Sequence, residues 1–334
     1  MQKVIERKVK KEKGAVTSMT WLDPPTIAVG LENGDIVLMD GNTGTKMRSW
    51  KAYLCAGDFN HPGRVVTFLV AVTTQQLVSE CNNHVKSWDI ESGTLMWSND
   101  FGFHNDITTL ALVMEHIAVG VKDGIIFLLE VISGQQSFVF SHQGRIVGIC
   151  SVSKDMFVSG SRDDTICVWS STSRHVTKTG KRLFSLSPAR HGVVAGLHDL
   201  ISNWRVAFYQ LDPKTGMFTE TWLMRSGSYQ GIPFHHMMDP FLVTVLDIPN
   251  NRQIRITSIL DKHHFRFIVM HGGPISSILF SSCGTRMITG SHDRCIRIQR
   301  LYYDLEVRLA SMMHGLICPA FKTLFAKCKR FYLA

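Results

Sequence analysis

The sequence predicts an all-β fold in which one small antiparallel sheet is repeated along the chain. Two observations lead to this prediction: a hairpin pattern near the middle of the chain, and the return of that pattern at intervals of about 37 to 45 residues. The composition allows it, because 45% hydrophobic residues across 334 positions can fill a large core. The longest apolar runs, 65–72 and 124–132, have the length of strands. A membrane is therefore not an expected partner.

The hairpin pattern is clearest at Phe157–Trp169, which reads FVSGSRDDTICVW. We predict two short strands, Met156–Ser159 and Thr165–Trp169, because Gly160, Ser161 and two aspartates between them supply turn chemistry. The second strand is apolar on both faces. A sheet with this pattern should be covered on both sides.

Four polar or amphipathic residues are expected to form one buried network around this hairpin. They are His142, Ser159, Asp163 and Trp169. A buried indole N–H needs an acceptor and a buried carboxylate needs donors, and a hydrogen-bonded chain through the four residues would supply both. A network satisfied in this way makes a core rigid.

This hairpin and its network resemble those of the WD-repeat family. The resemblance implies a β-propeller, in which each copy is a four-stranded blade, and a protein that binds partners rather than transforming substrates. It also implies that partners bind on the face that carries the turn between the second and third strands and the start of the first strand.

Other copies of the pattern can be traced along the chain, so we predict a seven-bladed WD40-type β-propeller over residues 14–313. The seventh copy retains His271, Thr289 and Asp293 but has Gln299 where tryptophan is expected. An eight-bladed ring and an open fragment of a longer ring stay as alternatives. The copies are Gly14–Trp50, a second that opens at His61 and includes Val85–Gly93, a third that opens at His104, then His142–Thr179, Gly180–Met224, Ser226–Met270, and the seventh from His271.

The two ends leave ring closure ambiguous. The basic N-terminal segment, residues 1–13, contains the strand-like Val4–Val9, and Leu305–Met312 could supply the same outermost strand. The tail, residues 314–334, predicts a basic amphipathic helix with Phe321 and Leu324 on its apolar face. Such a helix could lie on a membrane surface, in a partner's groove or on the edge of the propeller itself.

No catalytic, cofactor or metal motif is present in the sequence, so we expect no enzyme activity, no cofactor and no metal. The adjacent pairs His235-His236 and His263-His264 make poor chelates, because neighbours in a strand point to opposite faces. The eight cysteines show no C-x-x-C spacing. Buried reduced thiols are expected, which indicates an intracellular protein of the cytoplasm or nucleus.

A basic arc is the candidate partner-binding site. The net charge of +9 favours anionic partners, and the family resemblance brings five positions onto one face of the ring. Arg162 matches a position that contacts ligand in phosphopeptide-reading relatives, whereas Glu32 takes the equivalent place in the first copy. The five are Arg64, Lys122, Arg145, Arg162 and His292.

The leading hypothesis is a scaffold that docks other proteins within a multiprotein complex, through acidic or phosphorylated segments. The sequence pI of about 9.2 keeps an RNA- or ribonucleoprotein-associated factor as an alternative. A third hypothesis is a substrate receptor of a ubiquitin ligase. Relatives that bind a cullin adaptor carry Arg or Lys two residues after the Trp-Asp pair. Neither the site at Trp88 nor the site at Trp169 has Arg or Lys there, which weakens this hypothesis.

Overall fold

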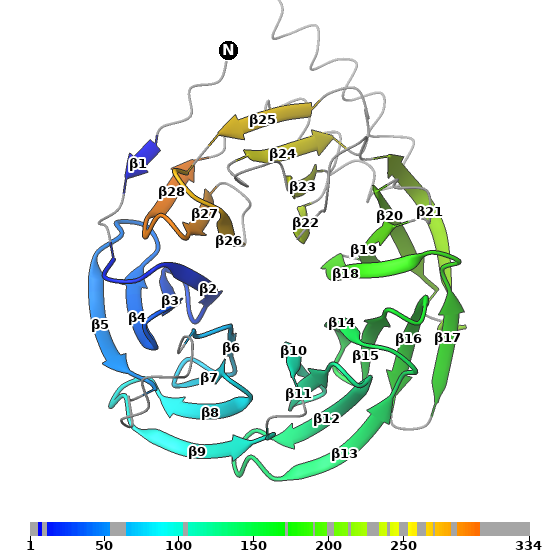
Figure 1. The fold of residues 1–334 in the computed structure, drawn as a ribbon, viewed down its shortest axis with the longest axis horizontal. Coiled ribbons are helices and arrows are strands. Elements are labelled where there is room, and N and C mark those ends of the chain that lie inside the picture. The colour runs from blue at the N-terminus through cyan, green and yellow to red at the C-terminus, as the bar shows by residue number, and fades with distance from the viewer. Residues whose placement is uncertain are drawn as a thin grey trace, which may run out of the picture.

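A computed structural model gives the fold of the chain (Figure 1). It describes residues 6–8, 12–53, 65–102, 106–170, 173–189, 191–198, 204–212, 215–225, 234–238, 241–246, 253–258, 265–269, 271–281 and 286–300. These residues form 28 β-strands and no helix. Accordingly, the described part of the chain contains no helix that could cross a membrane. The expected C-terminal helix lies outside the described residues.

The described strands form seven four-stranded antiparallel sheets, which Figure 1 shows arranged as blades around a ring. The all-β propeller that the sequence predicts is confirmed. Six of the blades consist of four consecutive strands, and the seventh combines three strands from the end of the described chain with β1 (Glu6–Lys8) from its beginning. We number blades 1 to 7 in chain order from β2.

Blades 1 to 4 correspond to the first four copies of the sequence pattern. Blade 1 contains β2 (Val16–Trp21), β3 (Thr26–Leu31), β4 (Asp35–Asp40) and β5 (Lys46–Lys51), and blade 2 contains β6 (Phe68–Ala71), β7 (Gln76–Cys81), β8 (His84–Asp89) and β9 (Leu95–Asp100). Blade 3 contains β10 (Ile107–Val113), β11 (His116–Val121), β12 (Ile125–Glu130) and β13 (Gln136–Ser141), and blade 4 contains β14 (Ile146–Ser153), β15 (Met156–Ser161), β16 (Thr165–Ser170) and β17 (Arg174–Lys178).

Blades 5 to 7 include the sixth copy, which the sequence identifies only by spacing. Blade 5 contains β18 (Arg182–Ala189), β19 (Gly192–His198), β20 (Trp204–Leu211) and β21 (Phe218–Arg225), and blade 6 contains β22 (Phe234–Met238), β23 (Phe241–Leu246), β24 (Gln253–Ser258) and β25 (Phe265–Val269). Blade 7 adds β26 (Ile275–Phe280), β27 (Arg286–Ser291) and β28 (Ile296–Arg300) to β1. In blade 6 the sequence indicated the last three strands but missed β22.

Strand β1 closes the ring. It pairs antiparallel with β28, with Arg7 opposite Ile298. Of the two closing strands that the sequence allowed, the N-terminal one therefore occupies the outermost place in blade 7. The competing segment, Leu305–Met312, lies outside the described residues.

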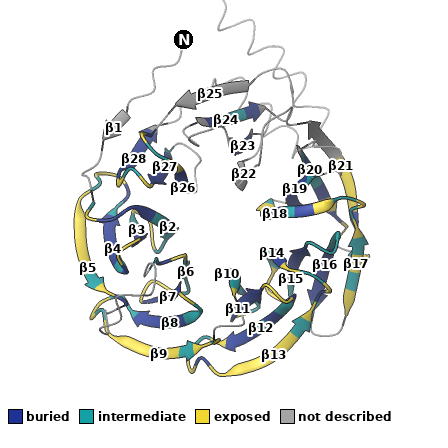
Figure 2. Cartoon of the chain, viewed as in Figure 1, coloured by how far each residue is buried: buried dark blue, intermediate teal, exposed yellow. Residues whose placement is uncertain are grey.

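The core lies in the seams between neighbouring blades. One cluster joins Ile126 of blade 3 to Phe157 and Trp169 of blade 4, and another joins Val16 of blade 1 to Ile288 of blade 7. Figure 2 shows the consequence: where residues are described, the middle strands are largely buried, the inner strands are partly buried, and the outermost strands β5, β9 and β13 are largely exposed. Because each blade is covered only by its neighbours, the blades stabilise one another around the ring.

Candidate functional site

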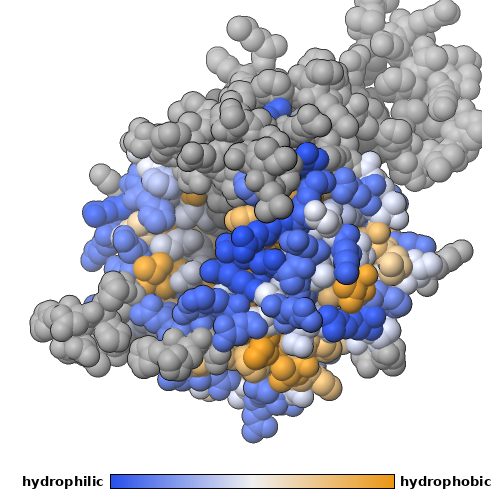
Figure 3. All heavy atoms as spheres, turned by 45° about the vertical axis from the view of Figure 1, so that its right-hand side comes forward, coloured by the Kyte–Doolittle hydropathy of each residue, from blue (hydrophilic) through white to orange (hydrophobic). Residues whose placement is uncertain are grey.

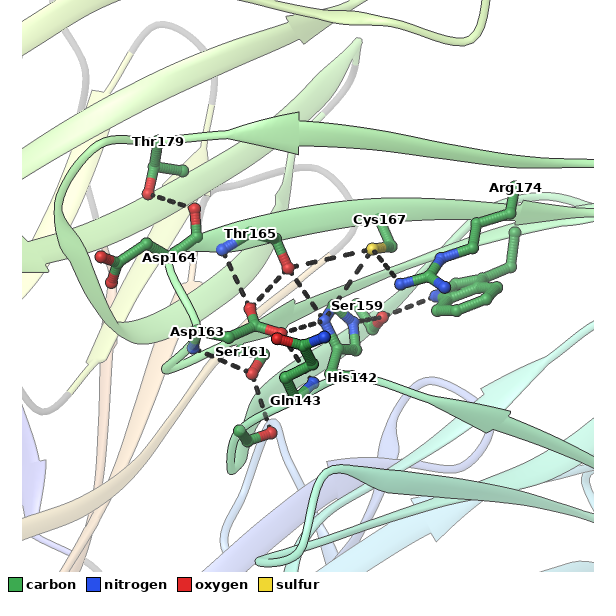
Figure 4. Close-up of polar contacts among 12 residues, drawn as sticks. His142, Gln143, Ser159, Ser161, Asp163, Asp164, Thr165, Cys167, Arg174 and Thr179 are labelled. Atoms are coloured by element: carbon green, nitrogen blue, oxygen red, sulfur yellow. Dashed lines mark hydrogen bonds and ion pairs between the residues drawn. The ribbon is translucent and has the colours of Figure 1, made fainter.

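The structure brings the four predicted network residues of blade 4 together (Figure 4). His142 Nδ1 lies 3.3 Å from Asp163 Oδ2, and His142 Nε2 lies 2.7 Å from Ser159 Oγ. The indole Nε1 of Trp169 donates to Ser159 Oγ at 2.6 Å. Strands β15 and β16 supply the serine and the tryptophan, and the turn between them supplies the aspartate.

The chemistry of each group fixes the direction of this chain of hydrogen bonds. A carboxylate only accepts, so His142 Nδ1 carries the proton, and Nε2 must accept from the Ser159 hydroxyl. Burial lowers the pKa of His142, although Asp163 opposes the shift. Burial raises the pKa of Asp163, but hydrogen bonds from Thr165 and the Gln143 backbone outweigh it and leave that pKa below its ordinary value. The pair is a neutral imidazole beside a carboxylate, with both side chains occupied by structural hydrogen bonds.

Blade 7 repeats the first part of this network. His271 Nδ1 lies 3.1 Å from Asp293 Oδ2, and His271 Nε2 lies 2.8 Å from Thr289 Oγ1. Gln299, which replaces the tryptophan, is 2% exposed, and its Oε1 has no hydrogen-bond partner among the described residues. The network of blade 7 thus includes the three predicted residues, and the side-chain carbonyl of Gln299 takes no part in it among the described residues.

Blade 2 contains a variant of the network that the sequence analysis missed. The predicted opening residue, His61, lies outside the described residues. The phenol oxygen of Tyr53 instead lies 3.0 Å from Ser79 Oγ, which accepts a 2.8 Å hydrogen bond from Trp88 Nε1. The ammonium of Lys86 lies 4.4 Å from the centre of the Tyr53 ring. No spacing rule pointed to Tyr53, because it precedes the copy's histidine in the sequence.

One face of the ring carries the turns between second and third strands together with the segments that lead into the first strands. We call it the turn face, and we define it by residues 31–35, 121–125, 161–165 and 291–295 and the segments before β10, β14, β18 and β26. Backbone hydrogen bonds join the two kinds of segment: the Arg162 N–H donates to the Arg145 carbonyl at 2.9 Å, and the His292 N–H donates to the Pro274 carbonyl at 3.0 Å.

Three arginines form a cluster on the turn face of blades 4 and 5. The half-buried guanidinium of Arg162 lies 5.0 Å from the centre of the Phe184 ring. Burial lowers the pKa of Arg162, and the positive charges of Arg145 and Arg182 lower it further. Both neighbours are exposed. Arg182 is the first residue of β18 and takes the place in blade 5 that Arg145, directly before β14, takes in blade 4, yet the weak sequence pattern of blade 5 did not identify it.

The other predicted members of the basic arc differ in their surroundings. Lys122 Nζ forms a 3.3 Å ion pair with Asp106, which offsets its charge. His292 is exposed on the turn of blade 7. Arg64 lies outside the described residues. On the described turn face, the positive charges of Arg145, Arg162 and Arg182 lie near one another, and Arg294 adds an exposed positive charge on the turn of blade 7.

The described residues contain no group of three His, Cys, Asp or Glu side chains able to hold a metal ion. Four of the eight cysteines are described, and all four are buried: Cys81, Cys150, Cys167 and Cys295. Burial raises the pKa of Cys150 to about 12, so this thiol is not a nucleophile at neutral pH.

A groove of about 540 Å³ lies on the opposite face of the ring, between blades 2 and 3. Strands β6, β10 and β12 each begin at the turn face and end at this opposite face. The groove is mainly apolar, and Ile132 at its margin is 84% exposed. Its lining consists of Val72, Thr73, Leu112, Glu115, His116, Glu130, Val131 and Ile132.

Comparisons with known proteins give the same architecture. A family model described as "WD domain, G-beta repeat" matches residues 134–170 and 264–298, which cover much of blades 4 and 7. The fold is similar to the crystal structure of RRP9 WD40 repeats, with a TM-score of 0.68, 16% identity, and coverage of 89% of this chain and 97% of that chain. It is also similar to the computationally designed Ika8 protein, with a TM-score of 0.58, 20% identity, and coverage of 88% and 98%. Among individually curated proteins, none matches the sequence significantly.

Proposed function

Because this chain is a WD-repeat β-propeller, we propose that it is a non-catalytic scaffold that binds acidic or phosphorylated segments of other proteins on its turn face. WD-repeat propellers generally bind other proteins. The ring itself supplies a rigid support, since every blade is packed between two others. Its individual surface residues then determine which partner is recognised.

The observation that carries the proposal is the arginine cluster of blades 4 and 5. Arg162 is held against the Phe184 ring, and its Nε has no hydrogen-bond partner among the described residues. Arg145 and Arg182 are close enough to lower its pKa. An anion bound between the three would relieve their mutual repulsion and satisfy guanidinium donors. The planar guanidinium group suits carboxylate and phosphate because it can donate two parallel hydrogen bonds.

The histidine and aspartate residues near this cluster support a binding role. His142 and Asp163 are committed to Ser159 and to the turn backbone. Neither has a free atom with which to act on a substrate. The same network fixes the turn that carries Arg162, so it positions the cluster.

Charge reversal tests the proposal. We expect the R145E/R162E variant to lose at least tenfold in affinity for partners recovered from cells by affinity purification, because repulsion replaces two charge-assisted hydrogen bonds. The matched control is K46E/K154E, which changes the net charge equally on the opposite face. Phosphatase treatment of the partners separates phosphorylated from merely acidic ligands. Unchanged binding by R145E/R162E would rule out this site.

RNA is the competing ligand, because the same cluster and the net charge of +9 would also attract phosphodiesters. Purification with and without nuclease separates the two cases. Binding to RNA should weaken steeply with salt, and the slope should fall when Arg145 and Arg162 are reversed. Partners that survive nuclease and are lost on charge reversal support the protein scaffold.

A further inference from the structure

The outermost strand of blade 3, β13, has one edge that pairs with no other strand in the described part of the chain. The order of its sheet is β10, β11, β12, β13, so β13 pairs with β12 on one side only. It lies on the outer rim of the ring (Figure 1). An exposed edge presents a row of backbone donors and acceptors that another strand can extend.

This edge lacks the charges that usually protect such strands. The sequence contains no Asp, Glu, Lys or Arg between Glu130 and Arg145. Each of the other six outermost strands in the described part of the ring contains at least one charged residue: β1, β5, β9, β17, β21 and β25. Charged side chains on an edge oppose strand pairing between molecules, so β13 is the least protected edge.

The side chains of β13 are also apolar and exposed. Phe138 is 57% exposed and Val139 is 52% exposed, and successive residues of a strand point to opposite faces. Phe138 lies on the side of the blade that faces blade 4, where its ring contacts His116 at 6.1 Å between centres. Figure 3 shows apolar side chains gathered at the lower edge of the molecule, where β9 and β13 lie in Figure 1.

The sequence of β13 is self-complementary. The order Ser137, Phe138, Val139, Phe140, Ser141 reads the same in both directions. In an antiparallel pair centred on Val139, serine meets serine, Phe138 meets Phe140 of the other strand, and Val139 meets itself. A two-fold interface requires such a patch, because the same surface serves both subunits. Aromatic and β-branched cross-strand pairs stabilise antiparallel sheets.

We propose that the chain self-associates through β13, which pairs antiparallel with β13 of a second copy around a two-fold axis at Val139. The two blades then form one continuous eight-stranded sheet. The axis is perpendicular to that sheet, so the two rings lie side by side with their turn faces pointing in opposite directions. Two convex rims make a small interface, and the dimer should be weak, with dissociation in the micromolar range or above.

Sedimentation of the full chain over a wide concentration range tests this dimer. We expect a reversible monomer–dimer equilibrium whose dissociation constant rises at least tenfold in V139K, because two like charges then meet on the axis. The control is V176K on β17, another partly exposed valine on an outermost strand. It should leave the equilibrium unchanged, and thermal melting should show that both variants are folded.

Mixing two variants distinguishes this geometry from other kinds of association. V139K and V139E should each be monomeric, whereas an equal mixture should dimerise, because a lysine then faces a glutamate across the axis. A wild-type chain that stays monomeric up to millimolar concentration would overturn the proposal. A dimer that V139K leaves intact, or a mixture that does not associate, would do so as well.

Discussion

At the scale of single residues, Glu80 differs from its counterparts in the other blades. It pairs with Val85 in blade 2 at the register where five other blades have glycine: Gly30, Gly120, Gly160, Gly196 and Gly290. Glu80 is 3% exposed; its Oε1 accepts a 2.9 Å hydrogen bond from the Asn83 N–H, and its Oε2 has no partner among the described residues. Burial raises its pKa to about 7. Blade 2 therefore contains a buried carboxyl group for which the folded structure favours the protonated form.

This carboxyl group predicts a pH dependence of stability. The pKa of Glu80 in the folded chain lies above its ordinary value. The stability that Glu80 contributes is therefore complete when the pH is below that ordinary pKa, and it is lost as the pH rises through about 7. In E80Q this loss should disappear. The free energy of unfolding of E80Q should exceed that of the wild type by on the order of 2–3 kcal/mol at about pH 8 and approach it near about pH 4.5.

Urea denaturation at several pH values measures this difference. The low pKa of His142 has the opposite effect, since it weakens the folded state as the pH falls below its ordinary value. Only the difference between E80Q and the wild type therefore isolates Glu80. E115Q, which alters an exposed glutamate on the opposite face, is the control. A difference that does not depend on pH would contradict the prediction.

At the scale of the element, the hydrogen-bond network of blade 2 can be compared with that of blade 4. Ser79 Oγ accepts from Trp88, so its own proton can go to the phenol oxygen of Tyr53. The Tyr53 hydroxyl in turn lies 3.1 Å from the Ser79 carbonyl and 3.2 Å from the His84 carbonyl. A tyrosine here takes the part that histidine takes in blade 4.

We predict that Y53F lowers the free energy of unfolding by about 1–2 kcal/mol, because buried acceptors lose their donor. Chemical denaturation of Y53F, S79A and the double variant forms the test. The two substitutions should be non-additive, since both break the same chain of hydrogen bonds. Purely additive losses would mean that Tyr53 stabilises blade 2 by packing alone.

The sequence predicted elements best where local chemistry specifies them. Blade 4 was identified because its turn glycine, its aspartate and its tryptophan stand at fixed spacing. Strand β22 was missed, because Phe234–Met238 does not alternate between apolar and polar residues and contains two adjacent histidines. Tyr53 was missed because it precedes the histidine that opens its copy, and Arg182 was missed because the sequence pattern of blade 5 is weak.

At the scale of the whole molecule, ring closure depends on three residue pairs between β1 and β28. Removal of residues 1–11 should lower the free energy of unfolding by about 1–3 kcal/mol, since it removes the ladder hydrogen bonds of that edge. Hydrogen exchange should accelerate at Ile296–Arg300. A chain that lacks only residues 1–5 retains β1 and is the control. Equal exchange in the two truncations would show that β1 is dispensable.

The pairing of Glu6 with Gln299 also has a consequence for synthesis on the ribosome. At about 5–20 residues per second, a nascent chain emerges for tens of seconds before the partner of its first strand is translated. During that delay Val16 and Met19, which later pack against Ile288, remain in contact with water. The charges of Glu6, Arg7 and Lys8 suit a strand that must wait, because they discourage pairing with other polypeptides until β28 has been translated.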